Sequence, residues 1–290
     1  MADRGHTVRM PGPATAERHV GCHLGFDVSG SGVTLVLQVA PARPAAVREE
    51  RLVVAVDGDP SDGIITEVEG PHGGRLHVVR AGPGALTIDY ESAVRPVVAP
   101  ADDRGPADPI DPDALTYLRQ SRYAPSDELV GFATTELGHL PHDAARPAAI
   151  ASWVFERFAY TPGASGPLDT AVDTLLSGAG VCRDYAHVTV ALCRALEIPA
   201  RLVAVYAPGL SPMDFHAVVE ARVNGRWEVL DATRLAPRPA LVRIATGRDA
   251  ADTAFVTTLD GNAELTASEV FAVIEGDLPA DDHAASMRLP

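Results

Sequence analysis

The chain lacks most of the features that mark secreted and membrane-spanning proteins. It has three cysteines in 290 residues, which is too few for a disulfide framework, and an odd number leaves at least one thiol unpaired in the monomer. No segment approaches the roughly 18 uninterrupted apolar residues of a membrane-spanning helix. The first twenty residues carry several charges and no apolar stretch typical of a signal peptide. These absences favour a cytoplasmic location and no membrane partner.

Positive charge is also scarce. Asp and Glu number 39 against 24 for Lys and Arg, so the formal net charge is -15 at pH 7. No basic cluster interrupts this balance, and such a surface repels nucleic acid and anionic lipid. We therefore predict no nucleic-acid partner. The sequence leaves the oligomeric state open.

Nucleotide-binding and metal-binding patterns are missing as well. Neither a P-loop nor a dinucleotide fingerprint occurs. The ten histidines are scattered and the cysteines are far apart, without a CxxC pair. We therefore expect no cofactor and no metal site.

The first third of the chain has the alternation typical of β-strands. Apolar and polar residues alternate over 33–39 and again over 86–91, which is the period of a sheet with one wet face. Further candidate strands, separated by turn-forming Gly, Pro and Asp residues, are 52–56, 64–68 and 76–79. We predict a small antiparallel β domain over residues 1–98.

A connection and a second domain follow. Residues 99–113 hold four prolines and five aspartates with little to bury, so we interpret them as a linker. Residues 114–290 form the predicted second domain, in which helical spacing begins. Ser126 is the expected cap of a helix that ends at Gly138. Further helices are expected over 150–158, 169–176 and 181–196, with strands starting at Arg201.

Cys182 is the most informative residue. It stands in Gly178-Ala-Gly-Val-Cys-Arg-Asp-Tyr-Ala-His187, where a glycine turn brings a thiol to the first turn of a helix. Only a thiolate attacks a carbonyl carbon effectively, and a helix N-terminus favours that anion while offering N–H groups to an oxyanion. We predict that Cys182 is a nucleophile. The alternative is a small buried hydrophobic residue, the role we expect for Cys193.

A histidine and an aspartate follow on a predicted hairpin. His216 begins an alternating segment that reaches Asn224-Gly225, the strongest short hairpin signal. With a two-residue loop, Asp231 falls opposite Val218, so His216 and Asp231 become diagonal neighbours on one face, within reach of each other's side chains. A register slip of one residue would separate them. Asp231 would then orient the imidazole, whose other nitrogen takes the thiol proton.

Three weaker candidates lie near these positions. The Tyr160 hydroxyl or the Trp227 indole N–H could donate to an oxyanion, although aromatic residues in such places are usually core. Arg183 is a candidate substrate contact or a local ion-pair partner of Asp184. His187 lies on another face of the helix, and we expect it to pack or to be solvated.

The motifs resemble those of the transglutaminase-like superfamily. They are a G-x-G-x-C helix start at 178–182, an H-A-V strand at 216–218 and a D-A-T strand end at 231–233. The resemblance covers roughly residues 115–245. The β half, with Tyr117–Tyr123, resembles the N-terminal domain that bacterial members carry.

The resemblance implies an α+β fold: a papain-like core of helices packed on an antiparallel sheet, preceded by a small all-β domain. It implies Cys182 as nucleophile, His216 as base and Asp231 as orienting acid. Val218 and Ala232 depart from the tryptophan and proline of many relatives. Calcium dependence, known in the animal enzymes, is not implied because no matching ligand cluster is visible.

The expected chemistry is acyl transfer on an amide or peptide bond of a peptide or protein substrate, through a thioester. We favour hydrolysis, as in a protease or amidase, over transamidation. The alternatives are a protein-glutamine transamidase, or a non-catalytic module that keeps the fold and binds a peptide or protein.

Overall fold

The computed structural model describes residues 16–43, 45–60, 63–95 and 112–289. The predicted linker, residues 99–113, lies outside these ranges except for its last two residues. Within the described ranges, no helix is both long enough and apolar enough to cross a membrane.

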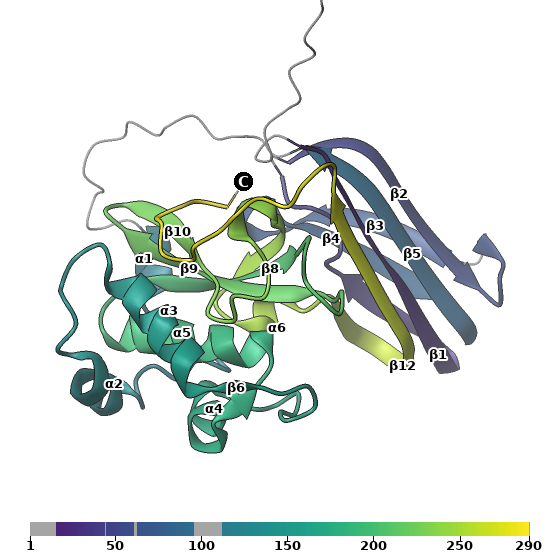
Figure 1. Cartoon of the computed structure of the whole chain (residues 1–290). Helices are drawn as coiled ribbons and strands as arrows, with labels where there is room; N and C mark the ends of the chain where they lie inside the picture. The colour runs from purple at the N-terminus through teal and green to yellow at the C-terminus, as the bar shows by residue number, and fades with distance from the viewer. Residues whose placement is uncertain (1–15, 44, 61–62, 96–111, 290) are drawn as a thin grey trace, which may run out of the picture.

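Six antiparallel strands form the larger sheet (Figure 1). They are β1 (Arg18–Leu37), β2 (Ala46–Val56), β3 (Gly63–Glu69), β4 (Arg75–Ala81), β5 (Gly84–Arg95) and β12 (Val256–Ile274). The order is β2-β5-β1-β4-β3, and β12 also pairs with β1. The strands predicted between residues 33 and 91 all lie in this sheet, so the alternation identified them correctly. A 3₁₀ turn, η3 (Pro71–Gly73), joins β3 to β4.

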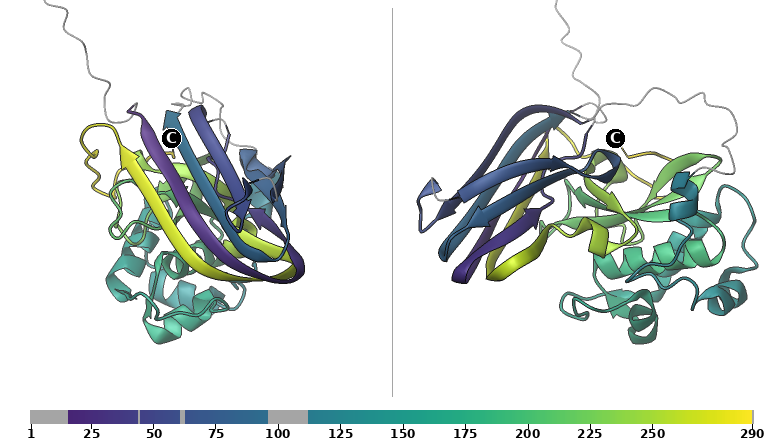
Figure 2. Two further views of the ribbon diagram at one scale, coloured as in Figure 1. Left: turned by 90° about the vertical axis from the view of Figure 1, so that its right-hand side faces the viewer. Right: turned by 180° about the vertical axis from the view of Figure 1, so that it is seen from behind.

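The long strand β1 organises this sheet. Along one edge, its residues 18–28 pair with β5 and its residues 33–37 pair with β4, while β12 follows the other edge over nearly the whole length. Figure 2 shows β12 beside β1 in both views. A Cβ on Gly261 of β12 would lie 2.1 Å from the Gly32 carbonyl oxygen, so only glycine fits where the ribbon bends.

The placement of β12 corrects one part of the predicted domain division. We expected residues 114–290 to form the second domain, but β12 completes the sheet of the N-terminal region. The sheet is therefore built from both ends of the chain. A division of the chain into an N-terminal and a C-terminal domain therefore does not describe the fold.

The smaller sheet has four antiparallel strands in the order β10-β9-β8-β11. Their bounds are β8 (Ala200–Tyr206), β9 (His216–Val223), β10 (Arg226–Leu230) and β11 (Val242–Gly247). In the β9–β10 hairpin Val223 pairs with Arg226, which confirms the predicted register. Asn224 and Gly225 have φ of 47° and 78°, as a type I′ turn requires.

Helices cover one face of the smaller sheet (Figure 1). They are α2 (Val130–Leu137), α3 (Arg146–Arg157), α4 (Ala171–Ser177) and α5 (Cys182–Ala195). The remaining short elements are α1 (Pro112–Thr116), β6 (Ala159–Tyr160), β7 (Ala179–Gly180), η4 (Arg238–Ala240) and α6 (Ala250–Thr253). Helix α5 packs on β8 and β9 because Tyr185, Val188 and Leu192 recur at helical spacing and are buried there.

Two helix starts differ from those predicted. Helix α2 begins after Leu129 without a side-chain cap, so Ser126 is not its N-cap. Helix α4 begins one residue after Thr170, whose hydroxyl accepts from the N–H of Asp173 while the Asp173 carboxylate accepts from the N–H of Thr170. This reciprocal pairing satisfies two donors of the first turn and sets the helix start.

The two sheets share one hydrophobic core. Its members come mainly from the inner face of the larger sheet, and Tyr206, Val242 and Ile244 of the smaller sheet join them. A second core lies between the helices and the smaller sheet, and a third contains Val203, Val205 and Val218, which alternate with the members of the second along β8 and β9. The fold is α+β, with helices on an antiparallel sheet beside an all-β sheet, which confirms the predicted class.

Candidate active site

The turn before α5 places the Cys182 thiol at the first residue of the helix. Gly178 ends α4 in the left-handed region, at φ 69°. A Cβ on Gly180 would lie 2.7 Å from the Asp184 Cβ, so this position must be glycine. The buried Asp184 carboxylate accepts from the N–H of Val181 at 2.8 Å. This bond gives a partner to the backbone N–H just before the helix and so fixes the turn that precedes Cys182.

Arg183 fixes the loop beside the thiol. Its guanidinium donates to Asp184 Oδ1 at 3.0 Å and to the Gly166 carbonyl oxygen at 2.7 Å. The ion pair with Asp184 was one of the predicted alternatives. Asp184 and Gly166 together hold the Arg183 guanidinium, and Arg183 forms part of the site wall.

His216 and Asp231 meet at the open end of the β9–β10 hairpin. His216 is the first residue of β9 and Asp231 follows the last residue of β10. The His216 Nε2 lies 3.0 Å from Asp231 Oδ2, and both side chains are fully buried. The other ring nitrogen, Nδ1, is buried without a hydrogen-bond partner among the described residues. The Cys182 Sγ lies 4.0 Å from the carbonyl oxygen of Phe215, the residue that precedes His216.

Buried charge decides the protonation of this pair. Burial opposes the charged imidazole, but the charge and the hydrogen bond of Asp231 outweigh it, and with help from the nearby Cys182 they raise the pKa of His216 to about 10. Burial also opposes ionisation of Asp231, yet His216 and Thr233 hold the pKa of this carboxyl below its ordinary value. The pair is therefore an imidazolium beside a carboxylate over the neutral range.

Thr233 is a site residue whose role the sequence analysis did not identify. Its hydroxyl donates to Asp231 Oδ1 at 2.7 Å, and its backbone N–H donates to the same oxygen at 2.9 Å. These bonds leave Asp231 Oδ2 for His216. The signals in the sequence were its place in the D-A-T motif at 231–233 and its position two residues after Asp231, where an aspartate commonly accepts from the backbone.

Tyr160 lies close to Cys182. It ends β6, which pairs with β7 just before Cys182, and the side chain is 41% exposed. Burial and the neighbouring Cys182 raise the pKa of Tyr160 to about 12. Its hydroxyl therefore keeps its proton at neutral pH and faces the thiol as a possible donor.

Trp227 lies elsewhere. The Arg201 guanidinium carbon is 4.0 Å from its ring centroid, and the Tyr117 ring meets it edge-on at 5.5 Å. Trp227 pairs with Arg222, which is about 20 Å along β9 from His216. The structure thus shows Trp227 in a packing role, which corrects the prediction that it borders the nucleophile.

The remaining residues singled out in the sequence are buried behind the site. His187 accepts from the N–H of Ala250 at 3.2 Å and stacks on Tyr123, and burial lowers its pKa to about 4. It packs as a neutral residue, as one of the predicted alternatives stated. Cys193 is also buried, as predicted, and all three cysteines are free thiols.

A cavity of about 450 Å³ opens beside the thiol. Cys182, Arg183 and His216 line it, together with Asp214 and Phe215 of the segment that enters β9. The far wall includes residues of α6, and Gln38 and Phe255, which lie next to β1 and β12 of the larger sheet. Cys182 and His216 therefore face one hollow, large enough for a small-molecule group or a substrate side chain.

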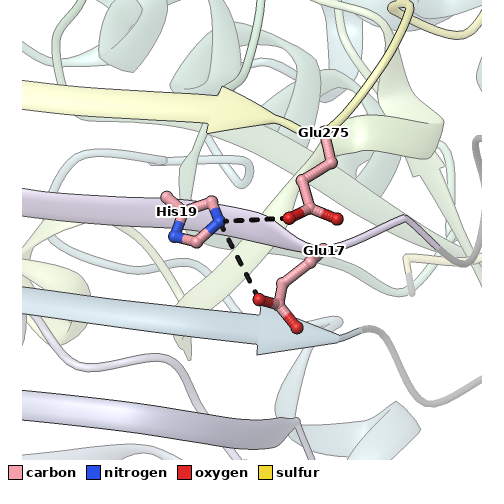
Figure 3. A group of neighbouring side chains, drawn as sticks. All are labelled: Glu17, His19 and Glu275. Carbon is pink, nitrogen blue, oxygen red and sulfur yellow. Dashed lines mark ion pairs between the residues drawn. The ribbon is translucent and has the colours of Figure 1, made fainter.

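One cluster among the described residues places three potential metal ligands together (Figure 3). The His19 Nε2 lies 3.8 Å from Glu17 Oε1 and 3.7 Å from Glu275 Oε1. Glu17 also accepts from the Arg95 guanidinium at 3.0 Å, which places a positive charge beside a would-be cation. We interpret the cluster as an ion-pair network joining the start of β1 to the end of β12. It shares no residue with the cavity beside Cys182.

Comparison with known proteins agrees with this architecture. The family model of the transglutaminase-like superfamily matches residues 131–232. A crystal structure of a candidate cysteine protease from Cytophaga hutchinsonii is 31% identical, covers 94% of this chain and 96% of that chain, and superposes with a TM-score of 0.81. The chain therefore belongs to the transglutaminase-like superfamily.

Two more distant relatives were also found. An uncharacterized protein of Mycobacterium leprae (strain TN) is 27% identical over 151 residues, or 47% of this chain and 52% of that protein. The alignment thus spans about half the length of this curated relative. The periplasmic domain of TgpA from Pseudomonas aeruginosa is 21% identical, with 77% of this chain and 90% of that chain covered and a TM-score of 0.37.

Proposed function

We propose that this protein is a thiol-dependent enzyme that transfers the acyl group of an amide or peptide bond, with Cys182 as nucleophile, His216 as base and Asp231 as the residue that orients the imidazole. Family membership and the likeness to a candidate cysteine protease support the class of enzyme. The observation that carries the residue assignment is the 3.0 Å pair of His216 Nε2 with Asp231. It leaves Nδ1 as the nitrogen free to exchange a proton with the thiol.

The first half-reaction forms a thioester. In the reactive form the proton of the Cys182 thiol is already on His216 Nδ1. Sγ then forms a bond to the substrate carbonyl carbon while the carbonyl oxygen becomes an oxyanion. The intermediate collapses as the C–N bond breaks, and Nδ1–H protonates the departing nitrogen. An amine leaves, and the acyl group stays on Cys182.

The second half-reaction restores the thiol. Water attacks the thioester carbonyl and gives a proton to Nδ1, the C–S bond breaks, and the sulfur recovers that proton as the acid leaves. An amine in place of water would give a new amide. We propose hydrolysis as the main outcome. The chain has no lysine, so a second copy of the protein offers no lysine side chain as an acceptor.

Two donors are proposed for the oxyanion. One is the N–H of Cys182 at the start of α5, since helix-terminal N–H groups have no partner within the helix. The other is the Tyr160 hydroxyl, whose raised pKa keeps it protonated. Arg183 holds the adjacent wall. The proposed partner is a peptide or protein substrate, and the cytoplasmic location stays a prediction.

Selective alkylation tests the nucleophile. The protein is treated with iodoacetamide at mildly acidic pH and the modified cysteine is located by mass spectrometry. Cys22 and Cys193 are internal controls, because both are buried and burial raises the pKa of each to about 12. We expect modification of Cys182 that is lost in His216→Ala. Equally slow labelling of all three thiols would instead favour a binding module that keeps the fold.

Incubation with substrates tests the reaction. Peptide, amide and glutamine-donor libraries are supplied with and without added amines, and products and protein adducts are weighed by mass spectrometry. We expect an acyl adduct on Cys182 and a free acid as the released product. Amide products that form only when an amine is added would replace hydrolysis by transamidation, and no adduct with any library would reject the acyl-transfer proposal.

A further inference from the structure

The cavity beside Cys182 has walls from both sheets. The larger sheet contributes Gln38, just after β1, and Phe255, just before β12. The smaller sheet contributes Leu202, Ala204 and Ile244. The hollow that starts at the nucleophile therefore ends at the junction of the two sheets, where their shared core begins.

Most of the inner wall is apolar, and the side-chain nitrogens of Gln38 and Arg183 on it already have partners. The Gln38 side-chain NH₂ donates to the carbonyl oxygens of Asp252 and Ala254 at 3.1 and 3.2 Å. The Arg183 guanidinium is shared by Asp184 and Gly166. A charged group placed deep in this hollow would lose its hydration without a strong new partner, whereas an apolar group would gain from leaving water.

An aromatic stack joins the far wall to the base. The rings of Phe215 and Phe255 are stacked, 4.9 Å apart at 19°, and Phe215 contacts Tyr206 at 5.7 Å. Phe215 directly precedes His216. The group that fills the cavity therefore contacts the side chain next to the catalytic histidine, on a wall that β12 completes.

We propose that this cavity selects acyl donors with a large apolar side chain, such as Leu or Phe, on the residue whose carbonyl Cys182 attacks. The inference rests on the proposed function and adds the substrate class. It assigns specificity to Phe255, Ile244 and the residues of α6. The larger sheet is thus part of the substrate site, in addition to its structural role.

A substrate series measures the selectivity. Peptide amides that differ only at this residue, as Ala, Leu, Phe, Glu or Lys, are compared by kcat/KM. Burying a Leu in place of an Ala side chain should raise kcat/KM roughly 10- to 100-fold. Equal values for all five substrates, or higher values for Glu or Lys, would overturn the proposal.

A filled cavity should abolish the preference. Ala254 lines the hollow and is only partly buried, so Ala254→Leu extends into empty space and should fold. Its kcat/KM for the Phe substrate should fall about tenfold or more, while alkylation of Cys182 by iodoacetamide stays unchanged. The matched control is Ala149→Leu on α3, a half-buried alanine outside the cavity wall. An unchanged preference in Ala254→Leu would contradict the assignment.

Binding separates this proposal from the reaction itself. In Cys182→Ala, which cannot be acylated, affinities for N-acetyl-leucinamide, N-acetyl-alaninamide and N-acetyl-glutamate amide are measured by NMR titration. We expect the leucine compound to bind tightest, and Ala254→Leu in the same background to remove its advantage. Selective binding without any adduct on the wild-type protein would support the cavity and reject the chemistry. Adducts that form equally with all donors would support the acyl-transfer chemistry and reject the selectivity of the cavity.

Discussion

The charge pair between His216 and Asp231 should make the stability of the protein fall in mildly alkaline solution. Asp231, with help from Cys182, raises the pKa of His216 from an ordinary 6.5 to about 10 against the opposing effect of burial. The unfolded chain releases this proton near pH 6.5, whereas the folded protein holds it up to about pH 10. Because the folded state binds more protons across this window, the free energy of unfolding decreases as pH rises.

The size of the effect follows from the difference between the two pKa values. One pKa unit corresponds to about 1.36 kcal/mol. At pH 7 the bound proton contributes about 4 kcal/mol, and at pH 9 about 1.4 kcal/mol remains. In Asp231→Asn only burial acts strongly on the imidazole, so the histidine should become neutral and this pH dependence should disappear. At pH 7 the variant should lose roughly 3–5 kcal/mol, the usual effect of breaking a buried pair.

Urea unfolding at pH 7 and pH 9 measures both quantities. The wild type should lose about 2.5 kcal/mol between these pH values beyond any loss in Asp231→Asn. Changes at the other cysteines and tyrosines are common to both proteins and cancel in the comparison, and the chain has no lysine to titrate. Asp214→Asn is the control, since Asp214 is an exposed carboxylate of the same cavity. Parallel pH profiles for the wild type and Asp231→Asn would refute the reasoning.

Three further predictions concern residues around the site. Thr233→Val removes the 2.7 Å hydrogen bond from the Thr233 hydroxyl to the Asp231 carboxylate, and a hydrogen bond to a charged group contributes about 1.5–3 kcal/mol. The rate of acylation of Cys182 should therefore fall about tenfold or more in Thr233→Val and be normal in Thr233→Ser. Equal rates for the two variants would contradict this role. The buried His187 binds its proton only near pH 4, whereas the unfolded chain binds it near pH 6.5, so the free energy of unfolding of the wild type falls as the pH drops through this range. In His187→Gln the free energy of unfolding, measured with urea, should fall less between about pH 6.5 and 4. A fall as steep as that of the wild type would show that another group titrates. Gly180→Ala should lower the free energy of unfolding by about 1–3 kcal/mol, since the added Cβ would overlap Asp184. Gly131→Ala, whose Cβ would meet open space, should be neutral or slightly stabilising in thermal melts. Equal melting temperatures for the two variants would contradict the close contact at Gly180.

Local interactions made much of the site predictable from the sequence. The glycine turn and the helical spacing after it specify where α5 starts and hence the thiol's position at the helix terminus. Asn224-Gly225 sets the register of its hairpin, because a two-residue turn leaves one pairing, and that register brings His216 to Asp231. These features depend on residues close together in the chain.

Long-range packing decided what the sequence could not. Strand β12 pairs with β1 although more than two hundred residues separate them. The alternation of apolar and polar residues predicts a strand but does not indicate which other strand it pairs with. Trp227 lies on the same hairpin as Asp231, yet the cation–π contact with Arg201 shows it packed at the other end. The cavity needs Ile244 from within β11, Gln38 just after β1 and Phe255 just before β12. A cavity has no local sequence pattern, because its shape depends on how whole sheets and helices pack.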